Sequence, residues 1–141
     1  CYADGSSAMK IAKRDDEPGN NCFEVYSSGG KVWTYIKQKV KFTPNTTYVV
    51  EFDVRTLGKN NGDTSPDVES SYVVNAMYNG ADHIAHASSA KVSDGFVHMK
   101  VEINIPGSCN NENDIISIYA NPVGDLGVNY QIDNWKMTLM E

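Results

Sequence analysis

The sequence predicts an all-β protein, an antiparallel β-sandwich with few or no helices. Apolar and polar residues alternate with a period of two along most of the chain, and turn-forming residues interrupt this pattern at regular intervals. No segment shows the three-to-four-residue apolar repeat of an amphipathic helix. The 141 residues, of which 40% are hydrophobic, suffice for one domain with its own core, and we place no boundary within 1–141.

The first half of the chain predicts four strands. Met9 and Ile11 alternate with polar neighbours, and a second strand around Phe23 and Val25 ends at the Ser-Ser-Gly-Gly run of 27–30. In the segment 34–42 the apolar positions share one face and a row of lysines shares the other, as in a half-buried strand. After a Pro-Asn-Thr turn, a strand over 48–55 places Val50, Phe52 and Val54 on its apolar face, and 58–67 is expected to be a loop.

The second half predicts four further strands. They cover 69–78, 96–105, 115–120 and 130–139, and the last has an expected irregularity near Asp133 and Asn134. The Asn-Gly pair at 79–80 is a strong hairpin signal, whereas 83–90 shows no clear period. In the strand over 115–120, the alternating apolar positions at 116, 118 and 120 are expected to point into the core.

Charge and composition exclude several classes of partner. The net charge is −6, from 12 basic and 18 acidic residues, so the chain lacks the basic surface that nucleic acid or an anionic membrane requires. No apolar stretch approaches the length of a transmembrane helix. The chain starts at Cys1 without Met, which indicates a piece of a longer protein or, alternatively, a lipidated bacterial N-terminus. One disulfide with one spare thiol, or three reduced thiols, are both compatible with Cys1, Cys22 and Cys109.

Catalytic motifs are absent from the sequence. There is no GxSxG, P-loop or HExxH motif, and the three histidines do not have the spacing of a strand-borne metal site. Two carboxylates could flank a glycosidic bond, the candidates being Glu51, Asp53, Glu69 and Glu102. Carboxylates on solvated strand faces usually serve solubility, so we expect no catalytic residue.

The aromatic residues indicate sugar binding. Eight Tyr and two Trp stand against four Phe, and Tyr and Trp combine a flat apolar face with a hydrogen-bonding edge that suits a pyranose ring. Trp33, at a loop-to-strand edge, is the best single candidate, although it could instead close one end of the core. On one strand face, Ser117, Tyr119 and Asn121 form a candidate sugar-binding surface or, alternatively, a plain solvated face. Tyr35 and Tyr72 are weaker candidates, and Trp135 is expected in the core.

Four segments, in order, resemble motifs of one group of modules. Gly5–Ile11 (GSSAMKI) is similar to the opening-strand pattern G-S-x-S-L-K-I, and Thr43–Arg55 (TPNTTYVVEFDVR) resembles T-P-G-T-T-Y-T-V-S-F-x-V-R. Ser93–Phe96 (SDGF) resembles the pattern D-G-W, and Tyr130–Trp135 (YQIDNW) resembles the closing-strand pattern Y-x-I-D-D-V. The combination spans nearly the whole chain and resembles the jelly-roll carbohydrate-binding modules of families 4, 9, 16 and 22, which accompany bacterial xylanases and related glycoside hydrolases.

The resemblance implies a non-catalytic module from a secreted or cell-surface bacterial enzyme. Such a module holds xylan, or a β-glucan, in a cleft on one sheet and delivers an attached catalytic domain. Carried over by position, Trp33 matches the sugar-stacking loop tryptophan, and Tyr119 and Asn121 match cleft positions.

The resemblance also implies a structural calcium. Its ligands here would be the Asp133 carboxylate and the main-chain carbonyl of Lys10, in keeping with the preference of calcium for oxygen. This chain departs from the calcium-site pattern of these modules in two ways. The usual Phe-Glu pair of an earlier strand is missing, and Asn134 replaces the second aspartate of the closing strand. Either Glu24 or Asp4 substitutes for the missing glutamate, or the site is incomplete.

Three functions therefore remain open at the level of sequence. The first is a carbohydrate-binding module for xylan or a related β-1,4-linked glycan. The second is a small hydrolase or lyase on the same scaffold. The third is an inter-domain or cell-surface sandwich without a ligand.

Overall fold

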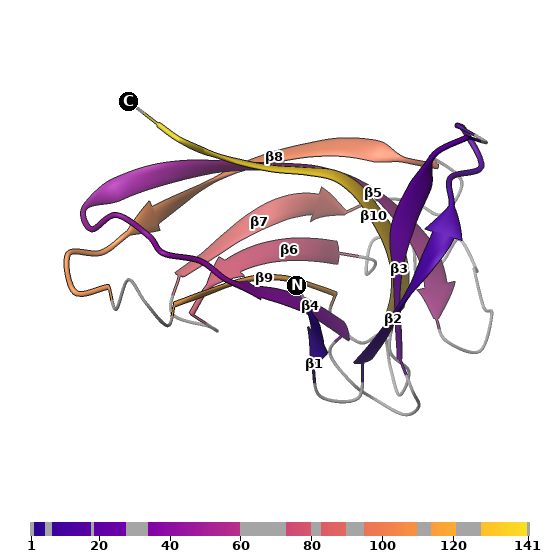
Figure 1. Cartoon of the computed structure of the whole chain (residues 1–141), viewed down its shortest axis with the longest axis horizontal. Helices are drawn as coiled ribbons and strands as arrows, with labels where there is room; N and C mark the ends of the chain where they lie inside the picture. The colour runs from indigo at the N-terminus through magenta and orange to yellow at the C-terminus, as the bar shows by residue number, and fades with distance from the viewer. Residues whose placement is uncertain are drawn as a thin grey trace.

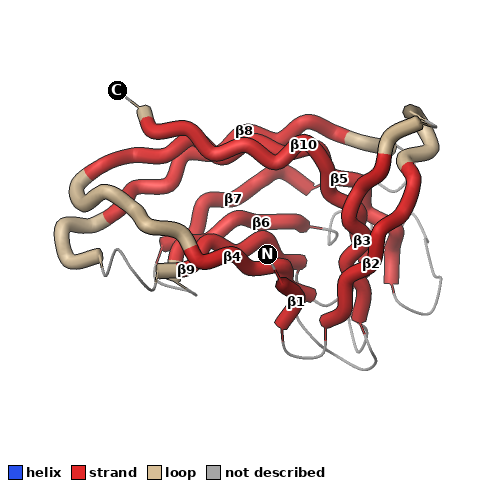
Figure 2. Tube along the Cα trace, viewed as in Figure 1, coloured by secondary structure: helices blue, strands red, loops and turns tan. Residues whose placement is uncertain are grey.

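Two stacked β-sheets make up the structure, a computed structural model that describes residues 2–4, 7–17, 19–27, 34–59, 73–79, 83–89, 95–109, 114–120 and 128–140 (Figures 1 and 2). Within these ranges the chain forms ten strands and no helix. The predicted all-β antiparallel sandwich is therefore confirmed. No helix in this part of the chain has the length and apolar character needed to cross a bilayer.

Each sheet has five strands, and all paired strands run antiparallel. Sheet A contains, in spatial order, β1 (Tyr2–Asp4), β4 (Thr34–Lys39), β9 (Ile115–Ala120), β6 (Val73–Tyr78) and β7 (His83–Ser89). Sheet B contains β2 (Ser7–Lys13), β3 (Asn21–Ser27), β10 (Val128–Leu139), β5 (Thr46–Lys59) and β8 (Val97–Ile105). In Figure 1 the long strands β5 and β10 bend, so that sheet B curls past one end of sheet A.

The core lies between the sheets because the apolar positions of each strand face inward. From sheet B, Val50, Phe52 and Val54 of β5 are buried, as the alternation predicts, beside the apolar positions of β8. From sheet A, Ile36 of β4 and the inward residues of β9 pack against them. Removing these side chains from water is the main favourable term in forming the sandwich. Cys22 and Cys109 are free thiols.

Some element boundaries differ from the sequence prediction. The expected loop starting at 58 is wrong at its beginning, because β5 continues to Lys59 by pairing with β10. Gly58 adopts φ 94°, a conformation open to glycine, next to a register shift in this pairing. Residues 83–89, which show no clear period, form β7, and β1 was not predicted. The hairpin predicted at 79–80 agrees with the antiparallel pairing of β6 with β7, and Asn79 has φ 47°, whereas Gly80 lies outside the described residues.

The predicted irregularity in β10 is also confirmed. The pairing of β10 with β5 shifts register between Asp133 and Lys136, and Asn134 adopts φ 51°. A β-bulge of this kind inserts an extra residue and re-aims the side chains that follow it. After the bulge, Trp135 lies on the inner side of sheet B, where its ring stacks on that of Phe52 with centroids 6.1 Å apart.

Candidate functional site

Three of the predicted ligand-binding residues come together on the outer face of sheet A. Tyr35 of β4 and Tyr119 of β9 are paired in register, and their ring centroids lie 5.9 Å apart at an interplanar angle of 32°. Ser117 lies two residues before Tyr119 and therefore shares its face. All three point away from the core because their neighbours Ile36 and Ile118 point into it. The alternation therefore predicted this face correctly.

The exposure of these residues differs from the expectation of an open aromatic surface. Tyr119 is only 3% exposed and Ser117 only 1%, whereas Tyr35 is half-buried. Burial, and secondarily the nearby Tyr35, raise the pKa of the Tyr119 hydroxyl, so it stays protonated and neutral at physiological pH. Tyr35 is thus the ring with an accessible part, and Tyr119 supports it from the central strand.

A buried hydroxyl and a cation complete this face. The Ser117 Oγ has no hydrogen-bond partner among the described residues, which is costly for a buried polar atom. The Lys37 Nζ lies 4.8 Å from the centroid of the Tyr35 ring, within the range of a cation–π contact. The sequence analysis placed Lys37 on the correct face but did not predict its cation–π contact with Tyr35. The two residues are two positions apart on one strand, and this spacing could have indicated the contact.

The other predicted ligand-binding residues, Trp33, Tyr72 and Asn121, lie outside the described residues. Their roles remain predictions.

The predicted metal ligand Asp133 lies on the outer face of sheet B, beside a buried arginine. Arg14 is 5% exposed, and its guanidinium donates hydrogen bonds to Asp16 (2.7 and 2.9 Å), Asp53 (2.9 Å) and Asp133 (3.0 Å). The guanidinium carbon also lies 4.1 Å from the centroid of the Phe96 ring. Asp53 in addition accepts a hydrogen bond from the Asn134 amide at 2.8 Å.

These contacts shift the pKa values of Arg14, Asp53 and His98. The hydrogen bond to Asp16 raises the pKa of Arg14 despite the opposing effect of burial, and the bonds to Asp133 and Asp53 add to it. Burial alone would raise the pKa of Asp53, but hydrogen bonds from His98, Asn134 and Arg14 together outweigh it and lower the pKa. His98 contacts Asp53 at 2.8 Å and Glu51 at 3.2 Å, and these bonds raise its pKa. The Asp53 carboxylate is therefore ionised at neutral pH, and within the protein it already has Arg14, His98 and Asn134 as partners.

The described residues do not fit a calcium site at Asp133 and Lys10. Calcium needs six to eight oxygen ligands, and no group of three or more His, Cys, Asp or Glu side chains in the described part of the chain is arranged to hold a metal. The Arg14 guanidinium already supplies the positive charge beside Asp133. Glu24, one possible substitute for the missing glutamate ligand, already forms an ion pair with the Lys10 ammonium at 3.0 Å. We therefore assign no role to calcium here, and its binding remains a prediction of the resemblance.

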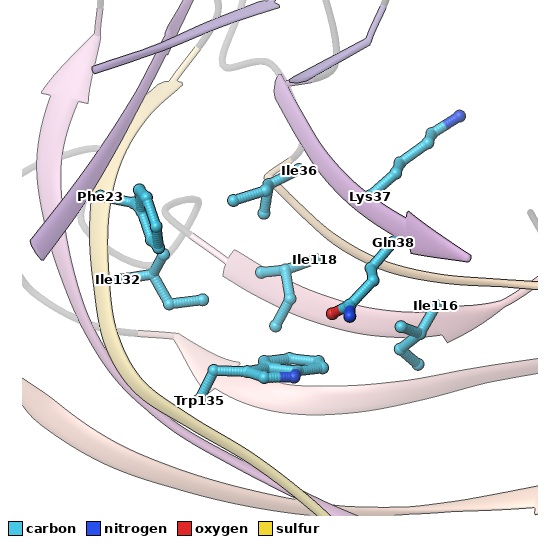
Figure 3. A pocket seen from close by; sticks show the side chains of 8 residues that line it. All are labelled: Phe23, Ile36, Lys37, Gln38, Ile116, Ile118, Ile132 and Trp135. Atoms are coloured by element: carbon cyan, nitrogen blue, oxygen red, sulfur yellow. The ribbon is translucent and has the colours of Figure 1, made fainter. Parts of the chain in front are cut away.

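A separate pocket opens between the two sheets (Figure 3). Its volume is about 190 Å³, and its lining is almost entirely apolar, formed by Phe23, Ile36, Lys37, Gln38, Ile116, Ile118, Ile132 and Trp135. Trp135, expected in the core, is instead 36% exposed at this pocket, where one side of its ring stacks on Phe52. Phe23 is 38% exposed on another wall. Sequence reasoning did not find this pocket, since its residues come from four strands.

Comparison with known proteins shows the fold. No family model matches the chain, and no curated protein matches it. Among solved structures, an arabinose-bound GH51 α-L-arabinofuranosidase is similar with a TM-score of 0.70 at 10% identity, over 98% of this chain and 23% of that one. A Clostridium thermocellum endo-1,4-β-D-xylanase 10B, solved as CBM22-1–GH10 modules with xylohexaose, gives 0.62 at 9% identity, over 99% of this chain and 26% of that one.

A third structure matches over nearly its whole length. It is described as a CBM4, with a TM-score of 0.54 and 13% identity, over 99% of this chain and 94% of that one. The chain thus spans about a quarter of the first two matched proteins and nearly all of the third. At these identities the comparisons establish a β-sandwich like that of carbohydrate-binding modules, without assigning a family.

Proposed function

We propose that the outer face of sheet A binds a polysaccharide without cleaving it, xylan first and a β-glucan second. The observation that carries the proposal is the Tyr35–Tyr119 ring pair, with the Ser117 hydroxyl and the Lys37 ammonium on the same face. A half-buried tyrosine offers the apolar C–H face of a sugar a surface to lie on. Lys37 is a hydrogen-bond donor for sugar hydroxyls beside that ring. The likeness to structures described as CBM4 and CBM22-1–GH10 supports the proposal at the level of fold.

The placement of the described carboxylates favours binding over catalysis. Among the strand residues of sheet A whose side chains are described, none is Asp, Glu or His. The carboxylates of Asp53 and Asp133 lie on the other sheet and are bound to Arg14. Glycoside hydrolysis usually requires a pair of carboxyl groups on either side of the bond that breaks. A role in delivering an attached hydrolase, in a secreted or cell-surface bacterial protein, follows from the same proposal.

Affinity electrophoresis in gels containing xylan tests the proposal. Migration of the wild-type protein should be retarded, and Tyr35→Ala should weaken binding at least tenfold, the equivalent of about 1.4 kcal/mol. The matched control is Tyr26→Ala, because Tyr26 is also half-buried and also lies beside a lysine, with the Lys10 Nζ 5.5 Å from its ring centroid, but it belongs to β3 of sheet B. Tyr26→Ala should bind like wild type.

Two further measurements complete the test. Trp33→Ala examines the predicted stacking residue outside the described ranges, and it should also weaken retention. A reducing-sugar assay on xylan and β-glucan should detect no products. Equal retention of Tyr35→Ala and Tyr26→Ala would remove the outer face of sheet A from the binding site, and clear release of sugars would show that the chain is an enzyme.

A further inference from the structure

We infer that the pocket between the sheets binds a small, uncharged, flat aromatic molecule. This site is distinct from the proposed glycan site, because the two use opposite faces of β4. Tyr35 and Lys37 carry the outer face, whereas the side chains of Ile36 and Gln38 reach the pocket. In Figure 3 the Lys37 ammonium extends away from the pocket, so only the aliphatic part of that side chain contributes to the wall.

The size and lining of the pocket select for an apolar ligand. Ile36, Ile116, Ile118 and Ile132 form its walls, and the volume is about 190 Å³. An apolar cavity of about 150 Å³ lined by similar side chains stays dry and admits a benzene-sized molecule. A substituted single ring therefore fits here. A sugar does not suit the pocket, because most of its hydroxyls would lose their hydrogen bonds to water, and Gln38 is the one uncharged polar residue among the described lining residues.

Two aromatic rings at the pocket favour a flat ligand. Phe23 and Trp135 are each more than one-third exposed, unusually open for such side chains. One side of the Trp135 ring is covered by Phe52, at an interplanar angle of 26°. In Figure 3 the Trp135 ring spans one end of the pocket below Ile118. An aromatic ligand in this space extends the stack that Phe52 and Trp135 begin.

The backbone that positions Trp135 is itself held in an unusual conformation. Asn134 has φ 51°, and its side chain donates a hydrogen bond to the Asp53 carboxylate, which the buried Arg14 also binds. Strained residues that are fixed by several contacts are concentrated at functional sites. A β-bulge next to a site commonly re-aims one side chain. Here it leaves the Trp135 ring over the pocket rather than sealed in the core.

The Gln38 carboxamide determines which polar substituent the aromatic ligand can carry. The Gln38 carboxamide lies beside the pocket, near Trp135 and Ile116 in Figure 3, and it can donate or accept a hydrogen bond. Among the described residues of the lining, Lys37 alone is charged, and its ammonium extends away from the pocket. A ligand with one hydroxyl is therefore accepted, and a carboxylate in the same position is rejected by the cost of its desolvation.

Fluorine NMR with 4-fluorobenzyl alcohol tests the inference, with 4-fluorobenzoate as the charged analogue of the same ring. Wild-type protein should broaden and shift the signal of the alcohol in a saturable manner, and the benzoate should bind at least tenfold more weakly. Trp135→Ala removes the stacking surface, and Gln38→Trp fills the opening from an exposed position. Both should weaken binding of the alcohol at least tenfold.

The control variant is Leu139→Ala. Leu139 is also an exposed apolar residue of β10, but it does not line the pocket, so its loss should leave binding unchanged. Circular dichroism establishes that each variant is folded, and Gln38→Trp carries the test if Trp135→Ala unfolds. Absence of saturable binding by wild type, equal binding of alcohol and benzoate, or unchanged binding by folded Gln38→Trp would each overturn the inference.

Discussion

Replacing Arg14 by Met should destabilise the fold strongly. The Arg14 side chain is 4% exposed, and it bridges Asp53 and Asp133, whose side chains are each 16% exposed. Removing one partner of a buried ion pair typically costs about 3–5 kcal/mol, because the remaining charge has lost its compensation. Water can still reach the edges of the two carboxylates, so we expect a loss near 3 kcal/mol, at the lower end of that range. Met keeps a similar apolar length, which limits the loss of packing on Phe96.

The measurement is urea unfolding followed by circular dichroism at neutral pH. The matched control is Lys10→Met, which breaks the ion pair with Glu24 in the same sheet, where the Lys10 side chain is 58% exposed. Exposed pairs contribute little, so the control should remain close to wild type. The double variant Arg14→Met/Asp133→Asn should recover part of the loss, because it removes one of the uncompensated carboxylates.

The reasoning fails if Arg14→Met lowers the free energy of unfolding by less than about 1 kcal/mol, the usual limit of a surface ion pair. It also fails if the double variant is less stable than Arg14→Met alone. Either result would mean that solvent, rather than Arg14, compensates the carboxylates of Asp53 and Asp133.

Further predictions concern protonation, a buried hydrogen bond and calcium. The pKa of Asp53 is lowered in the folded protein, so the ionised Asp53 carboxylate stabilises the fold above the unfolded value of 3.8, and this contribution is lost as pH falls through the folded value. Urea unfolding at a series of acidic pH values measures this loss of stability, which should be smaller in Asp53→Asn. The pKa of His98 is raised, so its NMR titration midpoint should lie above 6.5 and return towards 6.5 in the same variant. Tyr78→Phe should cost about 1–3 kcal/mol in urea unfolding, because the buried Asp114 carboxylate loses a hydrogen bond from the Tyr78 hydroxyl. Calcium chloride should not raise the thermal midpoint through Asp133; a rise abolished by Asp133→Asn would instead support the calcium site that the resemblance predicts.

Strands were predictable wherever one face is wet and the other is buried. The alternation around Val50 and Phe52, and that around Ile116 and Ile118, fixed both the strands and their inward faces. The same alternation placed Tyr35, Ser117 and Tyr119 together on one outer face. Short side chains without a period hid β7, and the extension of β5 to Lys59 depends on pairing with β10, which no local pattern encodes.

Burial and long-range partners were the features that could not be predicted. The exposure of Tyr119 depends on what packs over its face, and strand period says nothing of that. Arg14 belongs to a polar run, and its burial arises only when Asp53 and Asp133 are brought to it from strands far apart in the sequence. Trp135 has the alternation of a core residue, but the bulge at Asn134 leaves part of its ring open.

The alternation of β4 carries a thermodynamic consequence. Tyr35 and Lys37 belong to the proposed glycan site, and Ile36 and Gln38 belong to the proposed aromatic site. Consecutive residues of β4 would therefore contact two different ligands. If occupancy of either site displaces this strand, the coupling free energy must act equally in both directions. A glycan that tightened the hold on an aromatic molecule would itself be held more tightly by the same factor.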